Sequence, residues 1–112
     1  MSLLGKVADY LALRRVPFAA VGGAALAVRG VARSTFDVDL LCTESAVATE
    51  AFWVIVARDG PLVDVRTGDG DDPLRGLVRV SYREERPVDV VVGRGAWLHG
   101  VLERAEPFRF LD

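Results

Sequence analysis

The chain has 112 residues, 51% of them hydrophobic, with 14 Lys and Arg against 16 Asp and Glu, a formal net charge of −2. This length predicts one domain, residues 1–112, that buries a core without disulfides, and the hydrophobic fraction excludes general disorder. The small negative charge excludes a bulk electrostatic attraction to nucleic acid, so we do not expect this chain alone to grip a long nucleic acid.

The first half of the chain alternates between helical and extended patterns. Apolar residues recur at near-helical spacing over residues 2–15, and Pro17 ends that predicted helix. A short buried strand is predicted over residues 18–21 and a helix over 23–29. A second strand is predicted over residues 36–42.

The second half begins with a predicted helix from residue 43 or 44 to about residue 58, ended by Asp59-Gly60-Pro61. Its aromatic residues, Phe52 and Trp53, are interpreted as core rather than as a base-stacking platform. Three strands, a final helix and a short extended end are predicted after it, over residues 62–66, 77–83, 88–92, 95–105 and 107–111. The turn of residues 83–87 predicts that the last two strands are antiparallel.

Two carboxylates at a strand and a pair of glycines before them form the most informative motif. Side chains in a strand alternate between faces, so Asp37 and Asp39 are expected on one face. Mg²⁺ prefers oxygen ligands and usually takes one or two carboxylates together with water and phosphate oxygens. Gly22 and Gly23 come between a predicted strand and a helix, where the backbone can approach a phosphate closely.

A simpler interpretation treats Gly22-Gly23 as a tight turn that binds nothing. It does not explain the carboxylates, because burying two neighbouring like charges costs several kcal/mol unless they are paired or bind a cation. A lone Asp-x-Asp would be weak evidence. Together with the glycine turn and a helix-length spacer, the pattern favours a site.

The segment from Val21-Gly22-Gly23 to Leu41, which contains Arg33-Ser34-Thr35-Phe36-Asp37-Val38-Asp39, resembles the signature of the polymerase-beta-type nucleotidyltransferase superfamily. It looks closest to the branch with abortive-infection-type toxins and aminoglycoside nucleotidyltransferases. The resemblance implies an α/β (α+β) fold, a mixed and mostly antiparallel central sheet flanked by helices. The family carries a third carboxylate on a later strand. Asp89 is the best match here, and Asp64, in a similar segment, is the alternative.

The resemblance also implies a reaction, the transfer of a nucleotidyl group from a nucleoside triphosphate to a hydroxyl. Two Mg²⁺ ions would bind the entering and leaving oxygens. Arg33 would contact a phosphate or the acceptor, or would orient an acidic residue by an ion pair. The implied site consists of the catalytic and metal-binding carboxylates Asp37, Asp39 and Asp89, and of Gly22, Gly23 and Arg33 for the triphosphate.

The chain departs from the family in two places. Many members have serine after the first glycine, where Gly23 offers only its backbone, and toxin-like relatives continue into a helical region that completes the site. We therefore expect the isolated chain to be weakly active or inactive, and to form a homodimer or bind a partner through apolar parts of its terminal helices. The expected acceptor is a small molecule, a protein hydroxyl or an RNA end, in a toxin–antitoxin context.

Two other functions stay open at this stage: a catalytically silent nucleotide-binding or antitoxin-like module of the same fold, and a plain structural domain. Cys42 is the only cysteine, which fits a reducing cytoplasm, and its position after a strand favours burial over nucleophilic chemistry. The acidic loop of residues 67–73 fails the calcium-loop pattern and is interpreted as solvated. No segment is long enough to suggest a membrane span.

Overall fold

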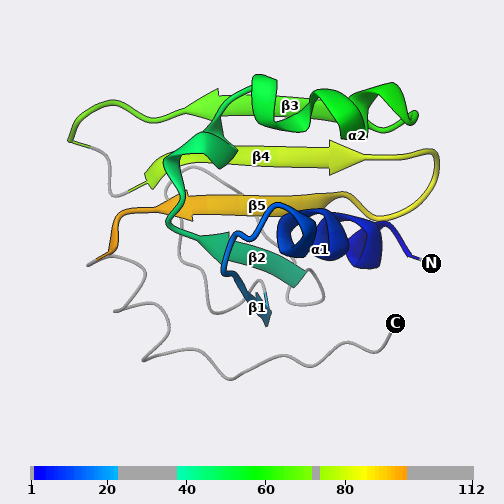
Figure 1. Cartoon of the computed structure of the whole chain (residues 1–112), viewed down its shortest axis with the longest axis horizontal. Helices are drawn as coiled ribbons and strands as arrows, with labels where there is room; N and C mark the ends of the chain where they lie inside the picture. The colour runs from blue at the N-terminus through cyan, green and yellow to red at the C-terminus, as the bar shows by residue number, and fades with distance from the viewer. Residues whose placement is uncertain (1, 23–37, 72–73, 96–112) are drawn as a thin grey trace.

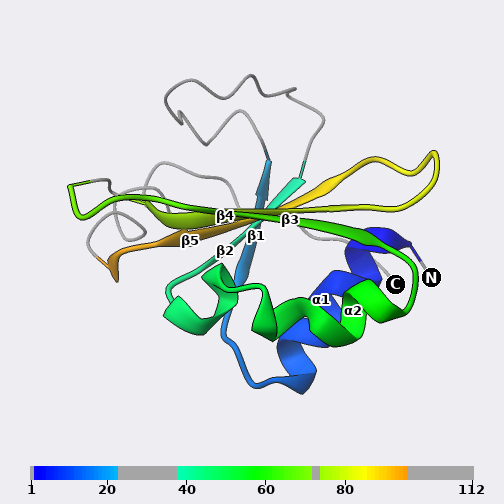
Figure 2. The ribbon, with the colours of Figure 1, turned by 90° about the horizontal axis from the view of Figure 1, so that it is seen from above.

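The computed structural model describes residues 2–22, 38–71 and 74–95. They form a five-stranded sheet in the order β1-β2-β5-β4-β3, with helices on one face (Figures 1 and 2). The elements in chain order are α1 (Leu3–Leu13), β1 (Ala19–Gly22), β2 (Val38–Cys42), the 3-10 turns η2 (Ser45–Ala48) and η3 (Ala51–Trp53), α2 (Val54–Arg58), β3 (Leu62–Thr67), β4 (Leu74–Ser81) and β5 (Val88–Gly93).

The sheet is mixed and mostly antiparallel. Only β2 and β5 are parallel, whereas β1 pairs antiparallel with β2, and β4 pairs antiparallel with both β5 and β3. The predicted α+β class, the five strands and the β4–β5 hairpin are therefore confirmed. The predicted helices over 23–29 and 95–105, apart from Gly95, and the extended end over 107–111 lie outside the described residues.

Helix α1 is fixed at both ends by hydrogen bonds. Ser2 Oγ accepts from the Gly5 amide at 3.0 Å, an N-cap that satisfies one of the free donors of the first turn. At the other end Arg15 has a φ of 59°, and the Val16 amide donates to the Leu11 carbonyl at 2.9 Å, as in a Schellman motif. The predicted helix over 2–15 is confirmed, but it ends through this left-handed residue and not at Pro17.

A continuous helix predicted from residue 43 or 44 to 58 is wrong. The segment instead contains η2, η3 and the short α2, with an extended residue at Thr49 (φ −130°, ψ 148°). The Thr49 hydroxyl donates to the Ala46 carbonyl at 2.6 Å and accepts from the Phe52 amide at 3.4 Å. A threonine hydroxyl can replace backbone partners in this way, and here it divides the helix into short turns.

The core lies between the helices and the inner face of the sheet. Tyr10, Phe52 and Trp53 form a ring cluster with centroid separations of 5.1 to 5.5 Å, and the Trp53 indole donates to the Val47 carbonyl at 2.8 Å. The prediction that Phe52 and Trp53 are core residues is confirmed. These aromatic rings supply the largest apolar surfaces beneath the sheet.

Gly76 is required where η2 crosses β4. A Cβ at this position would lie 2.7 Å from the Arg66 carbonyl oxygen and 2.8 Å from Ala48 Cβ. The absent side chain therefore lets η2 pack directly on the sheet.

Cys42, at the end of β2, is buried, and burial raises the pKa of its thiol to about 11. The predicted apolar role of this cysteine is thus confirmed. A neutral buried thiol is a poor nucleophile.

Candidate functional site

Four charged residues occupy one row across the sheet. In the strand register, Asp39 of β2 pairs with Asp89 of β5, Asp89 with Arg79 of β4, and Arg79 with Asp64 of β3. Directly paired residues project from the same face of a sheet. The neighbouring residue Leu40 belongs to the core beneath the helices, so the charged row lies on the opposite face.

The two carboxylates on the central strands are the buried polar side chains of the described residues. Asp39 is 0% exposed and Asp89 is 5% exposed. Their strands are neighbours, about 4.8 Å apart in any sheet. Two like charges about 5 Å apart repel by roughly 3 kcal/mol at an effective dielectric constant of 20, so this arrangement calls for compensating positive charge.

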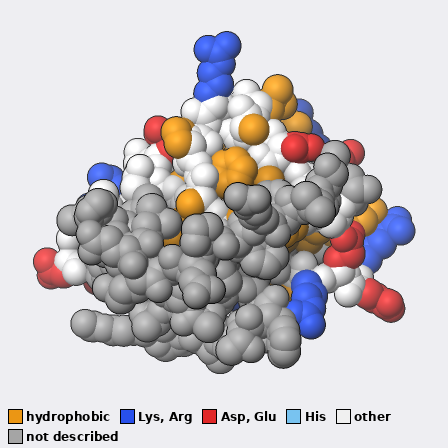
Figure 3. Space-filling model, turned by 90° about the horizontal axis from the view of Figure 1, so that it is seen from below, with side chains coloured by type: hydrophobic (Ala, Val, Ile, Leu, Met, Phe, Trp, Pro, Cys, Tyr) orange, Lys and Arg blue, Asp and Glu red, His pale blue; other side chains and the backbone are white. Residues whose placement is uncertain are grey.

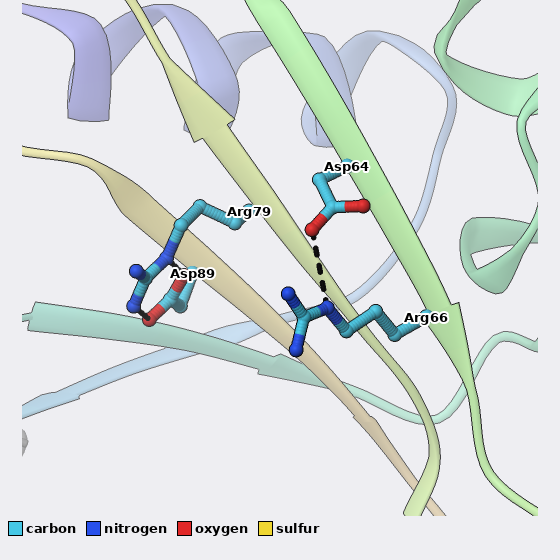
Figure 4. Close-up of polar contacts among 4 residues, drawn as sticks. All are labelled: Asp64, Arg66, Arg79 and Asp89. Atoms are coloured by element: carbon cyan, nitrogen blue, oxygen red, sulfur yellow. Dashed lines mark hydrogen bonds and ion pairs between the residues drawn. The ribbon is translucent and has the colours of Figure 1, made fainter. Parts of the chain in front are cut away.

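Arg79 supplies positive charge to Asp89. Its Nε donates to Asp89 Oδ1 at 2.9 Å and its Nη2 donates to Oδ2 at 3.0 Å, a bidentate pair (Figure 4). The Asp89 side chain is 6% exposed and that of Arg79 is 47% exposed, so the arginine reaches the buried carboxylate from the surface. Asp39, Asp89 and Arg79 together carry a formal charge of −1.

Asp64 lies further along the row, on the edge strand β3. Its carboxylate accepts from Arg66 Nε at 3.1 Å within the same strand (Figure 4). Both side chains are largely exposed, at 60% and 77%. Asp64, Arg66, Leu77 and Arg79 line a small hollow of about 90 Å³ beside the buried carboxylates.

The charged row lies toward the end of the sheet where β2 and β5 begin and β1 ends. Gly22, the last residue of β1, pairs with Val38, which directly precedes Asp39. The structure therefore brings Gly22, Asp39 and Asp89 to one end of three adjacent strands. The other predicted site residues, Asp37, Gly23 and Arg33, lie outside the described residues.

The donor atoms of this site suit a hard cation. Carboxylate oxygens are the protein ligands that Mg²⁺ prefers, and two of them on adjacent strands match the number it usually takes. Within residues 2–22, 38–71 and 74–95, no group of three or more His, Cys, Asp or Glu is placed to hold a metal. The described part of the site thus offers Asp39 and Asp89, and the other predicted carboxylate, Asp37, lies outside the described residues.

The sequence reasoning did not identify Arg79, although the pattern held a signal. Arg79 stands between Val78 and Val80 in an apolar strand, so it projects from the face opposite the core. The hairpin that joins β4 to β5 then places it opposite Asp89. Counting residue pairs outward from the turn along β4 and β5 would have suggested Arg79 as the partner of Asp89. The exact register of the two strands, however, depends on the turn geometry.

A larger hollow of about 470 Å³ lies between α1 and α2 on the other side of the molecule. It is lined mainly by apolar side chains, including Leu3, Val7 and Ile55, and also by charged residues of both helices. Asp39, Asp89 and Arg79 are not among the residues that line it. Partner binding through the apolar parts of the terminal helices stays a prediction.

Figure 3 shows how the basic side chains of the described residues are distributed on one face of the molecule. In the view of Figure 3, Lys and Arg side chains of the described residues are separated by other side chains and do not form a continuous basic area. That this chain does not grip a long nucleic acid alone stays a prediction. Of the described helices, none is long and apolar enough to cross a membrane.

Comparison of the chain with protein-family models, with curated proteins and with solved structures gave no match.

Proposed function

We propose that the chain is a metal-dependent nucleotidyltransferase with a polymerase-beta-like core, which moves a nucleotidyl group from a nucleoside triphosphate to a hydroxyl acceptor. The observation that carries the proposal is the pairing of Asp39 with Asp89, both buried, on adjacent parallel strands. The two carboxylates and Arg79 together carry a formal charge of −1, and a site for Mg²⁺ and triphosphate would account for two carboxylates on adjacent core strands. The end of β1 at Gly22, beside this pair, supports the same proposal.

In the proposed site Asp39 and Asp89, together with Asp37, would hold Mg²⁺. The bound ions would neutralise the charge that develops on the entering and leaving oxygens of an in-line displacement. In this proposal the Asp89 carboxylate would also accept the proton of the acceptor hydroxyl. Arg79 holds the Asp89 carboxylate by two hydrogen bonds and thereby fixes its orientation.

The triphosphate and the acceptor belong to the same proposal. The backbone of Gly22 and Gly23 and the side chain of Arg33 would bind the phosphates. The acceptor would be a small molecule, a protein hydroxyl or an RNA end, presented by a second subunit or partner, as in a toxin–antitoxin pair.

One observation favours the second candidate, a silent nucleotide-binding or antitoxin-like module. Both Asp89 oxygens already accept from Arg79, so a metal ion at Asp89 would have to share them or displace the arginine. A carboxylate oxygen has two lone pairs, so it can accept from the arginine and bind a metal ion at the same time. An adjacent guanidinium nevertheless weakens binding of a cation by repulsion.

The test is a pair of assays on the full chain. The first measures binding of each nucleoside triphosphate with and without Mg²⁺. The second follows label from the α-phosphate of the triphosphate into RNA, protein or small hydroxyl compounds, because nucleotidyl transfer keeps that phosphate. Asp39→Asn is the test variant, and Asp9→Asn is the matched control, since it makes the same change at an exposed position of α1, off the charged row.

Mg²⁺-dependent transfer that falls by about 100-fold or more in Asp39→Asn, but not in Asp9→Asn, supports the transferase. An equal loss in Asp89→Asn would identify Asp89 as the third carboxylate. Nucleotide binding without transfer of label supports the silent module. If the wild-type chain neither binds a nucleotide nor transfers label, both the transferase and the silent module are overturned. A structural domain is then left.

A further inference from the structure

We propose that the exposed edge strand β3 pairs with β3 of a second copy of this chain, in an antiparallel, two-fold arrangement centred on Val65. This surface is the edge of the sheet, two strands from Asp89, and the inference is argued from the residues of that edge and does not depend on the proposed function. Among the described strands, β3 ends the sheet and pairs only with β4. Figure 2 views the molecule from the β3 side, and α2 lies beside this strand rather than over it.

The direction of the backbone groups along β3 follows from one hydrogen bond. The Gly68 amide donates to the Arg75 carbonyl at 2.9 Å, in continuation of the β3–β4 register. Hydrogen-bonded and non-hydrogen-bonded pairs alternate along antiparallel strands. The amides and carbonyls of Val63, Val65 and Thr67 therefore point away from β4, toward the outer edge. They form a row of donors and acceptors that a further strand can use.

The charges on β3 select one register for a second copy. With the two-fold axis at Val65, Asp64 of each copy lies opposite Arg66 of the other, and the outward groups of Val63 meet those of Thr67. Asp64 and Arg66 then form non-hydrogen-bonded pairs, in which opposite side chains lie closest. The two neighbouring two-fold registers would place Asp64 opposite Asp64, or Arg66 opposite Arg66, and are disfavoured by repulsion.

The side chains on this edge agree with the same register. Leu62, 76% exposed, would lie opposite Gly68 of the second copy, which has no side chain to obstruct it. The edge contains no proline or lysine, the residues that commonly prevent strands from pairing. Because α2 packs against β3, the same two-fold axis brings α2 of both copies to one face of the joined sheet, with the exposed Val54 and Ile55.

The first experiment measures the molar mass of the full chain by light scattering and sedimentation over a wide range of concentration. We expect a dimer of twice 12.1 kDa that dissociates on dilution. Asp64→Arg and Arg66→Asp each replace the attractive cross-strand pairs with repulsive ones, so each is expected to weaken dimerisation roughly tenfold or more. Both side chains are largely exposed, so the fold is retained, which circular dichroism checks.

The decisive measurement mixes the two variants. A chain with Asp64→Arg carries two arginines on this edge and a chain with Arg66→Asp carries two aspartates, so only the mixture has opposite charges facing each other. Arg75→Asp and Glu84→Arg are matched controls, because they make the same charge changes at exposed positions off the edge and should leave the dimer unchanged. As the protein concentration rises, amide hydrogen exchange should slow at Val63, Val65 and Thr67.

A dimer that is lost in each single variant and restored in their mixture supports the two-fold β3 pairing. A wild-type chain that stays monomeric at the highest concentration overturns it. So does a dimer that neither charge change weakens, since another surface then forms it. Assembly into larger open polymers would also contradict the proposal, because a two-fold edge pairing closes at two copies.

Discussion

The ion pair between Arg79 and Asp89 makes a quantitative prediction about stability. Replacing Arg79 with methionine keeps much of the side-chain stem but removes both hydrogen bonds to a carboxylate that is 5% exposed. Hydrogen bonds to a charged group contribute about 1.5–3 kcal/mol, and the Asp89 charge, without the arginine, also repels the neighbouring Asp39 more strongly. The 47% exposure of the Arg79 side chain lowers the effect through solvent screening.

We therefore expect Arg79→Met to reduce the free energy of unfolding by about 2 kcal/mol, equivalent to a fall in Tm of roughly 8 °C for a chain of this size. The assay is urea unfolding at neutral pH followed by circular dichroism. A double-mutant cycle with Asp89→Asn should give a coupling energy of about 2 kcal/mol, because the second substitution removes the carboxylate charge that the first deprived of its arginine.

The exposed pair of Asp64 and Arg66 is the matched comparison. It has a similar separation, 3.1 Å, but both side chains face solvent, so its cycle should give less than about 0.5 kcal/mol. Both cycles are measured at concentrations where the chain is monomeric, so that pairing along β3 does not contribute. Equal coupling energies for the two pairs would refute the reasoning that burial of Asp89 makes the difference.

Three further predictions concern other parts of the fold. Asp39→Asn should leave the thermal stability of the metal-free chain unchanged or raise it, because it relieves repulsion in the carboxylate pair. Calorimetry should show that Mg²⁺-dependent nucleotide binding is lost in this variant. Marked destabilisation would show instead that internal partners stabilise this carboxylate. Gly76→Ala should cost about 1–3 kcal/mol in urea unfolding, since its Cβ would lie 2.7 Å from a carbonyl oxygen of β3 and 2.8 Å from η2, whereas Gly70→Ala, with no atom within 4 Å, should cost little. Burial raises the pKa of the Cys42 thiol from 9.0 to about 11, so the free energy of unfolding should fall as the pH rises from about 9 through about 11, because the thiol of the unfolded chain ionises first. Comparison with the pH dependence of unfolding of Cys42→Ala isolates this contribution. Identical slopes for the two chains would rule it out.

Local pattern in the sequence determined most of the described elements. The apolar spacing of α1 and the short apolar runs of the strands place their elements within a few residues, because burial of one face imposes a period on the chain. The segment over 43–58 was the exception. Helical spacing was present there, but the Thr49 hydroxyl took over backbone hydrogen bonds, and a competition of that kind depends on the detailed conformation.

From the sequence, Asp39 was expected in a site because it stands in an apolar strand after Asp37, and the family resemblance implied Asp89 as a further carboxylate of the same site. Only the tertiary structure decided that Asp39 and Asp89 are direct neighbours, because the parallel pairing of β2 with β5 joins two strands that are separated in the sequence by β3 and β4. It likewise placed Arg79 on Asp89 and left Asp64 at the exposed edge. A strand's own residues specify which of its side chains share a face, whereas its neighbours and their register follow from how the whole sheet packs.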